Sequence, residues 1–304
     1  MESPSVTLVV VPRERFSCAE RSLESIYEHT SFPFTLVYMD GGSPKQIKRY
    51  LEVKAQEKGF QLIRTDHYLS PNQARNLGLR QVKSKYVVFI DNDVLVSRGW
   101  LEALVRCAEE TKGWVVGPLY LMEERKDRRI HMAGGISHIR EEQGRRILYE
   151  QDHLAGMRLT DALASLRRGQ CELVEFHCML VRAEVFERLG PLDEQLLCIR
   201  EHDDLCLAVQ EAGGSIYLEP NAVATYVLPP PVTLSDFSYY RLRWSEPWIT
   251  ASLRHFHQKW DLDMDEHHSH YNYLWNRRHL FYWQYTKPFR PLKKLIRRGL
   301  GKLC

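Results

Sequence analysis

Residues 86–93 combine an uninterrupted apolar run with two carboxylates, and this stretch constrains the fold more than any other. The run from Tyr86 to Ile90 leads directly into Asp91-Asn92-Asp93. A strand without polar alternation is typical of a parallel sheet that is covered by helices on both faces. Open α/β sheets bind ligands at the carboxyl ends of such strands. Two carboxylates at that edge suit Mg²⁺ or Mn²⁺, and such an ion suits a diphosphate. A solvated turn is the alternative for so short a motif.

Strands and helices alternate through the first 118 residues. Three helix starts have the sequence of a capping box, in which Ser is followed three residues later by Glu or Gln. This alternation predicts an α/β fold with a doubly wound, mostly parallel sheet and helices on both faces. The glycines form neither G-x-G-x-x-G nor a P-loop, so the common dinucleotide and ATP cradles are excluded. The expected strands are 6–11, 34–39, 60–64, 86–90 and 115–117, and the helices begin near Ser17, Ser43, Ser70 and Ser97.

The second half is less regular. Residues 123–170 are rich in charge and are expected to leave the sheet as flexible, solvated loops. A strand at 172–182, a helix from Glu201 and two strand-like pieces at 215–218 and 222–227 then return to it. The expected domains are a catalytic domain (1–232, with halves 1–118 and 119–232) and a helical, aromatic-rich extension (233–304).

Composition places the chain among ordinary globular proteins. The net charge of +3 gives no indication of a nucleic-acid partner. Seven cysteines form no C-x-x-C pair and mostly lie among apolar residues, which indicates reduced thiols in a cytoplasmic protein. No signal peptide or apolar run of membrane-spanning length is found. The basic tail 287–304 is expected either to lie on the inner face of a membrane or to be disordered.

Four blocks, in order over about residues 5–228, resemble the family 2 glycosyltransferases of the GT-A fold. The first is the strand ending at Val9-Val10-Val11-Pro12, followed by a Ser-led helix. The second ends in Asp40-Gly41-Gly42-Ser43, similar to the family's Asp-Asn-Gly-Ser. The third is Ala74-Arg75-Asn76-Leu77-Gly78 followed by the D-x-D motif at 91–93, and the fourth spans 179–214 with an acidic motif.

The resemblance implies an inverting transfer of sugar from a UDP-, GDP- or dTDP-sugar to an acceptor hydroxyl, assisted by Mn²⁺ or Mg²⁺. It implies that Asp93 ligates the metal, and that Asp91 lies near both the metal and the ribose. Arg75 is expected either beside the diphosphate or paired with a carboxylate inside the fold. The remaining residues that the resemblance assigns to the nucleotide sugar are Pro12, Arg13, Glu14, Asp40, Gly41 and Asn92.

Inversion requires a general base for the acceptor hydroxyl. The family carries it in a Glu-Asp-x-Asp motif, whereas this chain reads Glu201-His202-Asp203-Asp204. His202 stands at the usual base position and has an ordinary pKa of about 6.5, which suits a proton acceptor. Glu201 and Asp203 are alternatives, and Asp204 is also a candidate for capping the helix. Tyr226 stands where many relatives have a metal-binding His.

Two other functions stay open on sequence alone. One is a glycosyltransferase-like protein that has lost activity and binds a partner, which the substitutions at His202 and Tyr226 would permit. The other is a sugar-phosphate nucleotidyltransferase, although such enzymes carry a glycine-rich loop and residues 12–16 contain no glycine. The acceptor is expected to be a polysaccharide or other glycan, a lipid-linked glycan or a protein, with a role in cell-envelope or polysaccharide biosynthesis.

Overall fold

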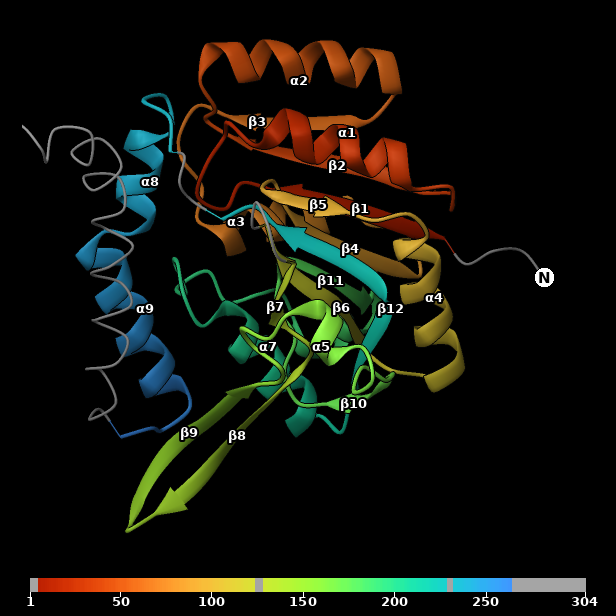
Figure 1. Cartoon of the computed structure of the whole chain (residues 1–304). Coiled ribbons are helices and arrows are strands. Elements are labelled where there is room, and N and C mark those ends of the chain that lie inside the picture. The colour runs from red at the N-terminus through yellow and green to blue at the C-terminus, as the bar shows by residue number, and fades with distance from the viewer. Residues whose placement is uncertain (1–4, 124–127, 229–231, 264–304) are drawn as a thin grey trace, which may run out of the picture.

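The computed structural model describes residues 5–123, 128–228 and 232–263. Its centre is a mixed, mostly parallel sheet in the order β10-β12-β6-β11-β4-β1-β2-β3 (Figure 1). Strand β11 runs antiparallel to both of its neighbours, and β12, β6, β4, β1, β2 and β3 share one direction. These strands are β1 (Val6–Val11), β2 (Thr35–Gly41), β3 (Gln61–Thr65), β4 (Tyr86–Asp91), β6 (Val115–Met122), β10 (Gly169–Cys171), β11 (Cys178–Arg182) and β12 (Ile216–Tyr226). The α/β architecture predicted from the sequence is confirmed.

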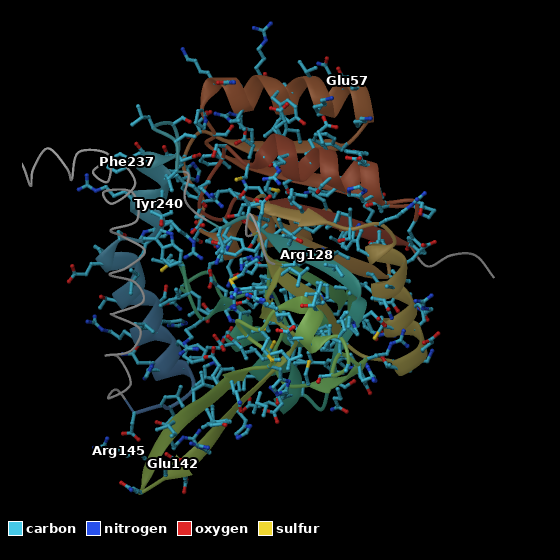
Figure 2. The ribbon with its side chains drawn as sticks, in the orientation of Figure 1. Glu57, Arg128, Glu142, Arg145, Phe237 and Tyr240 are labelled. Atoms are coloured by element: carbon cyan, nitrogen blue, oxygen red, sulfur yellow. The ribbon has the colours of Figure 1, made fainter. Side chains whose placement is uncertain are left out.

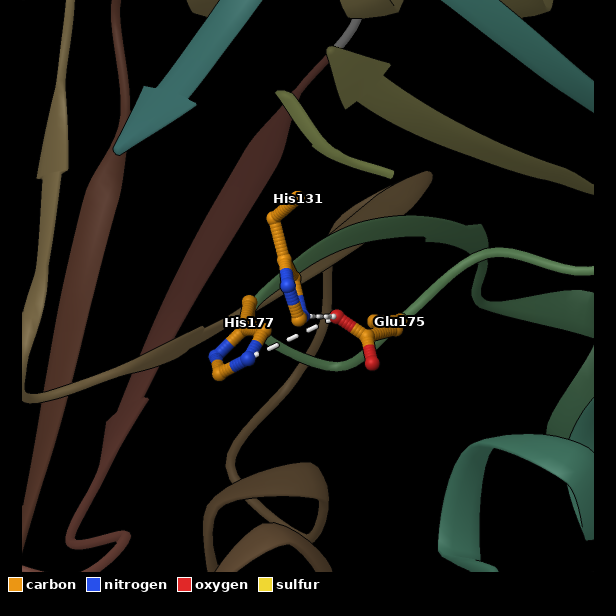
Figure 3. A group of neighbouring side chains, drawn as sticks. All are labelled: His131, Glu175 and His177. Atoms are coloured by element: carbon orange, nitrogen blue, oxygen red, sulfur yellow. Dashed lines mark ion pairs between the residues drawn. The ribbon is translucent and has the colours of Figure 1, made fainter. Parts of the chain in front are cut away.

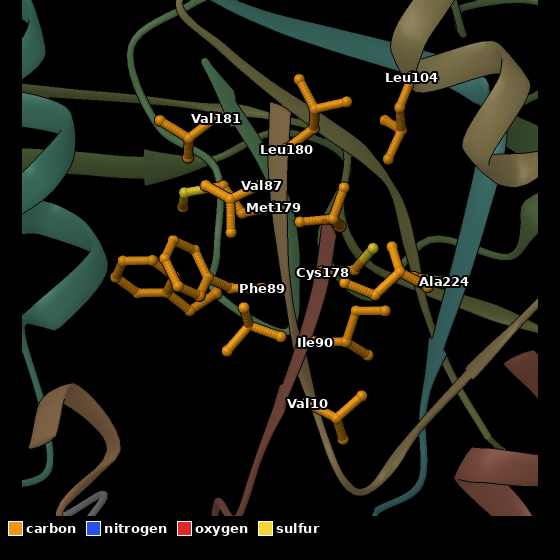
Figure 4. Close-up of a cluster of buried hydrophobic side chains, with 14 of the residues drawn as sticks. Val10, Val87, Phe89, Ile90, Leu104, Cys178, Met179, Leu180, Val181 and Ala224 are labelled. Atoms are coloured by element: carbon orange, nitrogen blue, oxygen red, sulfur yellow. The ribbon is translucent and has the colours of Figure 1, made fainter. Parts of the chain in front are cut away.

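The sheet is covered by helices on both faces, and β4 shows why its sequence is apolar throughout. Successive side chains of a strand point to opposite faces. Phe89 packs edge-on against Phe186 of α6 (Glu184–Leu189), and Ile90 lies on the face that carries Leu104 of α4 (Trp100–Thr111) (Figure 4). Both faces therefore demand apolar side chains.

Helix α3 (Pro71–Leu79) approaches the sheet more closely than a larger residue would allow. A Cβ at Gly78 would overlap a methyl group of Val9 on β1. The capping box predicted at Ser70 is confirmed, because the Ser70 hydroxyl accepts from the amide of Gln73 and the Gln73 side chain accepts from the amide of Ser70. This start fixes the helix that carries Arg75 toward the end of β4.

The other two predicted capping boxes are wrong. The Ser17 hydroxyl donates to Asp236 before α1 (Ala19–His29), and the Ser43 hydroxyl donates to Asp40 before α2 (Lys45–Lys58). In both cases the serine hydroxyl donates to a nearby carboxylate, and a hydrogen bond to a charged group is stronger than one between the hydroxyl and a helix amide. This tertiary contact therefore replaces the local cap. Both helices still begin within two residues of the predicted start.

Residues 129–152 form strands, and the prediction of flexible loops there is wrong. After β7 (Arg129–Met132), the hairpin of β8 (Gly135–Glu142) and β9 (Arg145–Asp152) extends away from the sheet, with Glu142 and Arg145 at its tip (Figures 1 and 2). Gln143 and Gly144 both have positive φ, as a two-residue hairpin turn requires. Much of the hairpin is exposed to solvent, so its strands lack the apolar alternation that marks a half-buried strand. A short helix, α5 (Leu159–Ala162), follows.

Several strand boundaries differ from the prediction, and β6 continues to Met122 where a strand over 115–117 was expected. The pieces expected at 215–218 and 222–227 are one strand, β12, with a register shift between Glu219 and Val223. An additional short strand, β5 (Val94–Val96), follows the Asp pair and joins β12. Strand β11 begins only at Cys178, so residues 172–177 form a loop instead of the strand expected there.

In the described part of the extension predicted to be helical, residues 233–263, the helices are α8 (Phe237–Arg243) and α9 (Glu246–Lys259). These helices pack against the rest of the chain through two apolar clusters. One joins Tyr240 and Ile249 to Cys198, and the other joins Phe256 to Leu148 of the hairpin and Leu207 of α7 (Glu201–Glu211). Phe237 and Tyr240 on α8 are labelled in Figure 2.

Among the described residues, no helix has the length and apolar character that crossing a bilayer requires. The basic tail 287–304 lies outside the described residues, so its predicted membrane contact stays a prediction. The cysteines at the six described positions are all free thiols. The domain division at 232/233 also remains a prediction.

Candidate active site

A cavity of about 360 Å³ opens at the carboxyl ends of β1 and β4. Its wall combines the loop after β1, the end of β4, strands β7 and β9, the loop before β11, the start of α7 and the end of α8. Charged groups dominate the lining, with six carboxylates and four guanidinium groups. The ionisable residues of the wall are Arg13, Arg75, Asp91, His131, Glu150, Asp152, Glu175, His177, Arg200, Glu201, His202, Asp203 and Arg243.

Asp91 lies at the centre of the donor side of this cavity. One carboxylate oxygen is 3.1 Å from Nη2 of Arg75. The other is 3.2 Å from Nε of Arg13 and 3.1 Å from Nδ1 of His177. Burial by itself raises the pKa of Asp91, but the contact with His177 and the charges of Arg75 and Arg13 bring it below its ordinary value. The residue is therefore a fixed anion, and of the two expectations for Arg75 the pairing with a carboxylate is confirmed.

Asp93 is fully buried behind Asp91 and does not line the cavity. Neither of its carboxylate oxygens accepts a hydrogen bond from the described residues, and Arg15 Nη2 lies 3.6 Å away. Burial raises the pKa of Asp93 to about 7, although the charges of Arg13 and Arg15 oppose this. One donor atom from each of Asp91, Asp93 and His177 lies within 4.8 Å of the others. This donor set, with an unsatisfied buried carboxylate, fits a divalent cation.

The loop after β1 is held in place by Asn92, whose side chain accepts from the Arg13 amide and donates to the Arg15 carbonyl. Arg13 reaches across to Tyr226, with Nη1 2.8 Å from the hydroxyl. Glu14 turns away from the cavity and is fully buried, where it accepts from Tyr226 and from Trp244 Nε1. Tyr226 therefore serves to fix this loop.

The end of β2 adjoins the same loop but lies outside the cavity wall. Asp40 is buried and accepts from the amide and hydroxyl of Ser43 and from Arg64. Gly41 lies so close to Pro12 that a Cβ would be 3.3 Å from the proline Cγ. In the described structure, Arg13, Arg75 and Asp91 reach the cavity, whereas Pro12, Glu14, Asp40, Gly41, Asn92 and Asp93 stand behind or beside it.

The acidic motif at the start of α7 faces the cavity with three of its four side chains. His202 is the most accessible of them, with 23% of its side chain exposed, and its Nε2 lies 3.5 Å from Asp203 Oδ2. Burial lowers the pKa of His202, but the charges of Asp203, Glu175 and Glu150 raise it above its ordinary value. Asp203 is fully buried, and Arg200 Nη1 lies 3.2 Å from its carboxylate.

The other two members of the motif are engaged elsewhere. Glu201 Oε1 lies 3.5 Å from Arg243 of α8. Asp204 does not line the cavity, because its carboxylate accepts from Trp260 Nε1 and from Lys259, both at 2.8 Å. Its side chain ties α7 to the C-terminal helices.

The sequence analysis missed four important residues. His131, Glu175 and His177 line the cavity from segments that were expected to be a flexible loop and a strand. Asp236 is fully buried and accepts from the amides of Phe16 and Ser17, which fixes the start of α1. A Glu-x-His pair directly before an apolar strand was a local signal for Glu175 and His177, since the carboxyl edge of a sheet is where ligands bind. No local pattern marks His131 or Asp236.

Comparisons with known proteins bear on the family and the fold. A model of glycosyl transferase family 2 matches residues 7–190. An uncharacterized protein of Sinorhizobium fredii is 25% identical over 218 residues, which are 69% of this chain and 23% of that protein. An uncharacterized glycosyltransferase of Rickettsia bellii is 26% identical over 110 residues, 36% of this chain and 16% of that protein.

Two solved structures share the fold. GalNAc-T7 with UDP, GalNAc and Mn²⁺ superposes with a TM-score of 0.60 at 16% identity, over 83% of this chain and 47% of that one. The mannosyltransferase PcManGT of Pyrobaculum calidifontis, in complex with GDP-Man and Mn²⁺, gives 0.54 at 18% identity, over 76% and 59%. The chain thus spans less than two thirds of each of these proteins.

Proposed function

The chain belongs to glycosyl transferase family 2, and we propose that it transfers a sugar from a nucleotide-diphosphate donor to an acceptor hydroxyl. One observation carries this proposal: Asp91, at the end of β4, and His202, at the start of α7, line a single cavity. A donor diphosphate needs positively charged groups, and an acceptor hydroxyl needs a proton acceptor close to the donor. The wall of this cavity offers both kinds of group.

On the donor side, the guanidinium groups of Arg13 and Arg75 are the candidates for contacting the diphosphate. For the base and ribose we assign the adjoining edge formed by Pro12, Asp40 and Gly41, with Asp40 exchanging its present contacts for the nucleotide. UDP-, GDP- and dTDP-sugars remain the candidate donors. The Mn²⁺ complexes of GalNAc-T7 with UDP and of PcManGT with GDP-Man support a nucleotide-sugar donor.

The metal fits the carboxylate pair. Asp93 and Asp91 would hold a Mn²⁺ or Mg²⁺ ion, which neutralises the negative charge that develops on a departing diphosphate. Support comes from Asp93, whose two oxygens accept no hydrogen bond from the described residues. The positively charged Arg15 behind Asp93 holds the carboxylate in place.

On the acceptor side we assign the general base to His202. Asp203 lies beside its Nε2 and would orient the imidazole and stabilise its charged form, so Asp203 is a positioning residue. Glu201, paired with Arg243, is the second candidate, and Asp204 is the weakest because Lys259 and Trp260 hold it outside the cavity. Direct attack by the activated hydroxyl on the donor gives inversion. The acceptor is proposed to be a hydroxyl of a polysaccharide or other glycan, of a lipid-linked glycan or of a protein.

The test is a donor panel of UDP-, GDP- and dTDP-sugars, with turnover measured as release of the nucleoside diphosphate with Mn²⁺ and with EDTA. We expect turnover of at least one donor that EDTA and Asp93→Ala both abolish. Asp161→Asn, a change of an exposed carboxylate on α5, is the matched control and should keep wild-type turnover.

Each other outcome has a defined meaning. Donor binding by calorimetry without turnover would favour the alternative of an inactive, partner-binding protein. Release of pyrophosphate from a nucleoside triphosphate and a sugar phosphate would favour a nucleotidyltransferase. Absence of donor binding across the whole panel would refute the proposed transfer.

A further inference from the structure

His131, Glu175 and His177 form a second group of side chains on the wall of the cavity (Figure 3). His131 comes from β7, and the other two come from the loop before β11. Nε2 of His131 lies 2.8 Å from Oε2 of Glu175, and Nε2 of His177 lies 3.5 Å from the same oxygen. Two imidazoles from separate segments therefore converge on one carboxylate.

We propose that these three residues form a site for a divalent transition-metal ion, distinct from the Asp91 and Asp93 pair. Their donor atoms all lie within 4.8 Å of one another. Three ligands placed tetrahedrally at about 2.0–2.1 Å from an ion are roughly 3.3 Å apart, and the observed 2.8 and 3.5 Å lie on either side of that spacing. Two imidazoles with one carboxylate suit Zn²⁺, Co²⁺, Fe²⁺ or Mn²⁺ and do not suit Mg²⁺, which prefers oxygen ligands.

The surroundings of His177 support the assignment. Its Nδ1 faces Asp91 at 3.1 Å, so its Nε2 is turned toward Glu175 and the cavity. A metal-binding His is usually held in this way, with the second ring nitrogen directed at a carboxylate. His177 therefore has one ring nitrogen facing each of the two groups, and the proposed site lies beside the carboxylate pair without using Asp93.

Access and charge fit an ion that enters from solvent. The side chains of His131 and Glu175 are 25% and 16% exposed, whereas that of His177 is 3% exposed and anchors the site. The wall of the cavity carries more carboxylates than guanidinium groups, so its charge favours the entry of cations. A water molecule or a substrate oxygen from the cavity would complete the coordination.

The proposal does not depend on the transfer activity, so the test uses metal binding alone. The full chain, freed of metal with a chelator, is titrated with Co²⁺ by visible absorption and with Zn²⁺ by calorimetry, in the absence of nucleotide. We expect a tetrahedral or five-coordinate Co²⁺ spectrum and a Zn²⁺ affinity that His131→Ala weakens by about tenfold or more. An excess of Mg²⁺ should not displace either ion.

Variants separate this site from its neighbours. Glu175→Gln keeps the size of the side chain and serves as a second test if His131→Ala does not fold, as judged by circular dichroism. His138→Ala is the matched control, since His138 pairs with Glu172 at 2.7 Å but forms no three-ligand group with a second imidazole among the described residues. This variant should bind metal as the wild type does. Asp93→Asn should keep the Co²⁺ spectrum.

Two results would overturn the assignment. One is a folded wild-type chain that binds neither Co²⁺ nor Zn²⁺. The other is binding that Asp93→Asn abolishes while folded His131→Ala and Glu175→Gln keep it, which would place the ion at the carboxylate pair. Neither result bears on donor turnover, which is measured separately.

Discussion

Asp93 is expected to destabilise the metal-free protein, and replacing it with Asn should make the chain more stable. Its carboxylate is fully buried and accepts no hydrogen bond from the described residues. Burial raises its pKa from an ordinary 3.8 to about 7. The charged form is thus less favourable in the folded protein than in the unfolded chain, and a neutral amide of nearly the same shape removes this cost.

The magnitude follows from the two pKa values. Above both of them the carboxylate is charged in either state, and a difference of about 3 in pKa corresponds to roughly 4 kcal/mol of lost stability. As the pH falls from 7 toward 4, the folded protein takes up a proton that the unfolded chain does not bind, so the wild type regains stability. Near pH 5 the remaining cost is roughly 1–2 kcal/mol, and it vanishes below the unfolded pKa.

The assay is urea unfolding in EDTA, followed by tryptophan fluorescence, for wild type and Asp93→Asn near pH 8 and pH 5. We expect the variant to be more stable at both values, by a margin that is larger near pH 8. Adding Mn²⁺ should narrow the margin near pH 8, because a cation bound at the Asp91 and Asp93 pair stabilises the wild type more than the variant.

A matched change at the end of β2 should act in the opposite direction. Asp40 is equally buried but accepts from Ser43 and Arg64, so Asp40→Asn removes satisfied interactions and should destabilise the protein. The reasoning fails if Asp93→Asn lowers stability near pH 8, or if its margin over the wild type is the same at both pH values.

Three further predictions test other parts of the molecule. Because neighbouring carboxylates raise the pKa of His202, the rate of transfer should increase with pH through an apparent pKa above 6.5. His202→Asp should move this limb of the pH–rate profile to lower pH, and a profile unchanged by the substitution would exclude His202 as the base. Asp204→Ala should lower the unfolding free energy by about 1–3 kcal/mol, because it leaves the buried indole N–H of Trp260 without its acceptor, while turnover of the folded enzyme stays within a few-fold. A loss of about 100-fold or more would return Asp204 to the catalytic candidates. Gly78→Ala should lower the free energy of unfolding in urea by about 1–3 kcal/mol, because the new methyl group overlaps Val9. Gly169→Ala is the control and should lower it less, because a Cβ there meets nothing within 4 Å.

The order of strands and helices along the chain could be predicted because each element is marked by a pattern of neighbouring residues. Neighbouring residues form the two patterns used, which are apolar strands of five or six residues and serine-led helix starts. Because the strands are buried on both faces, their side chains must be apolar throughout. The same local pattern predicts Asp91 at a ligand-binding edge of the sheet. Local patterns failed in the hairpin of β8 and β9, because strands that stand largely in solvent need no apolar side.

The immediate partner of each site residue was not predictable. Serine-led sequences at Ser17 and Ser43 match that at Ser70, yet only the last makes a capping box, because Asp236 and Asp40 provide better acceptors to the others. Likewise, nothing in the acidic motif itself shows that Asp204 turns to α9 while His202 turns to the cavity.

By itself the sequence determined the sheet, the edge at which its ligands bind and the carboxylates placed there, since each depends on residues close together in the chain. Only the tertiary structure decided that His131 meets Glu175 and His177 and that Glu14 and Asp40 are held by other side chains. It also decided that Asp93 is buried and that neither of its oxygens accepts a hydrogen bond from the described residues. These features depend on which distant strands and loops become neighbours and on what charge surrounds each buried group. A one-dimensional pattern carries no measure of either.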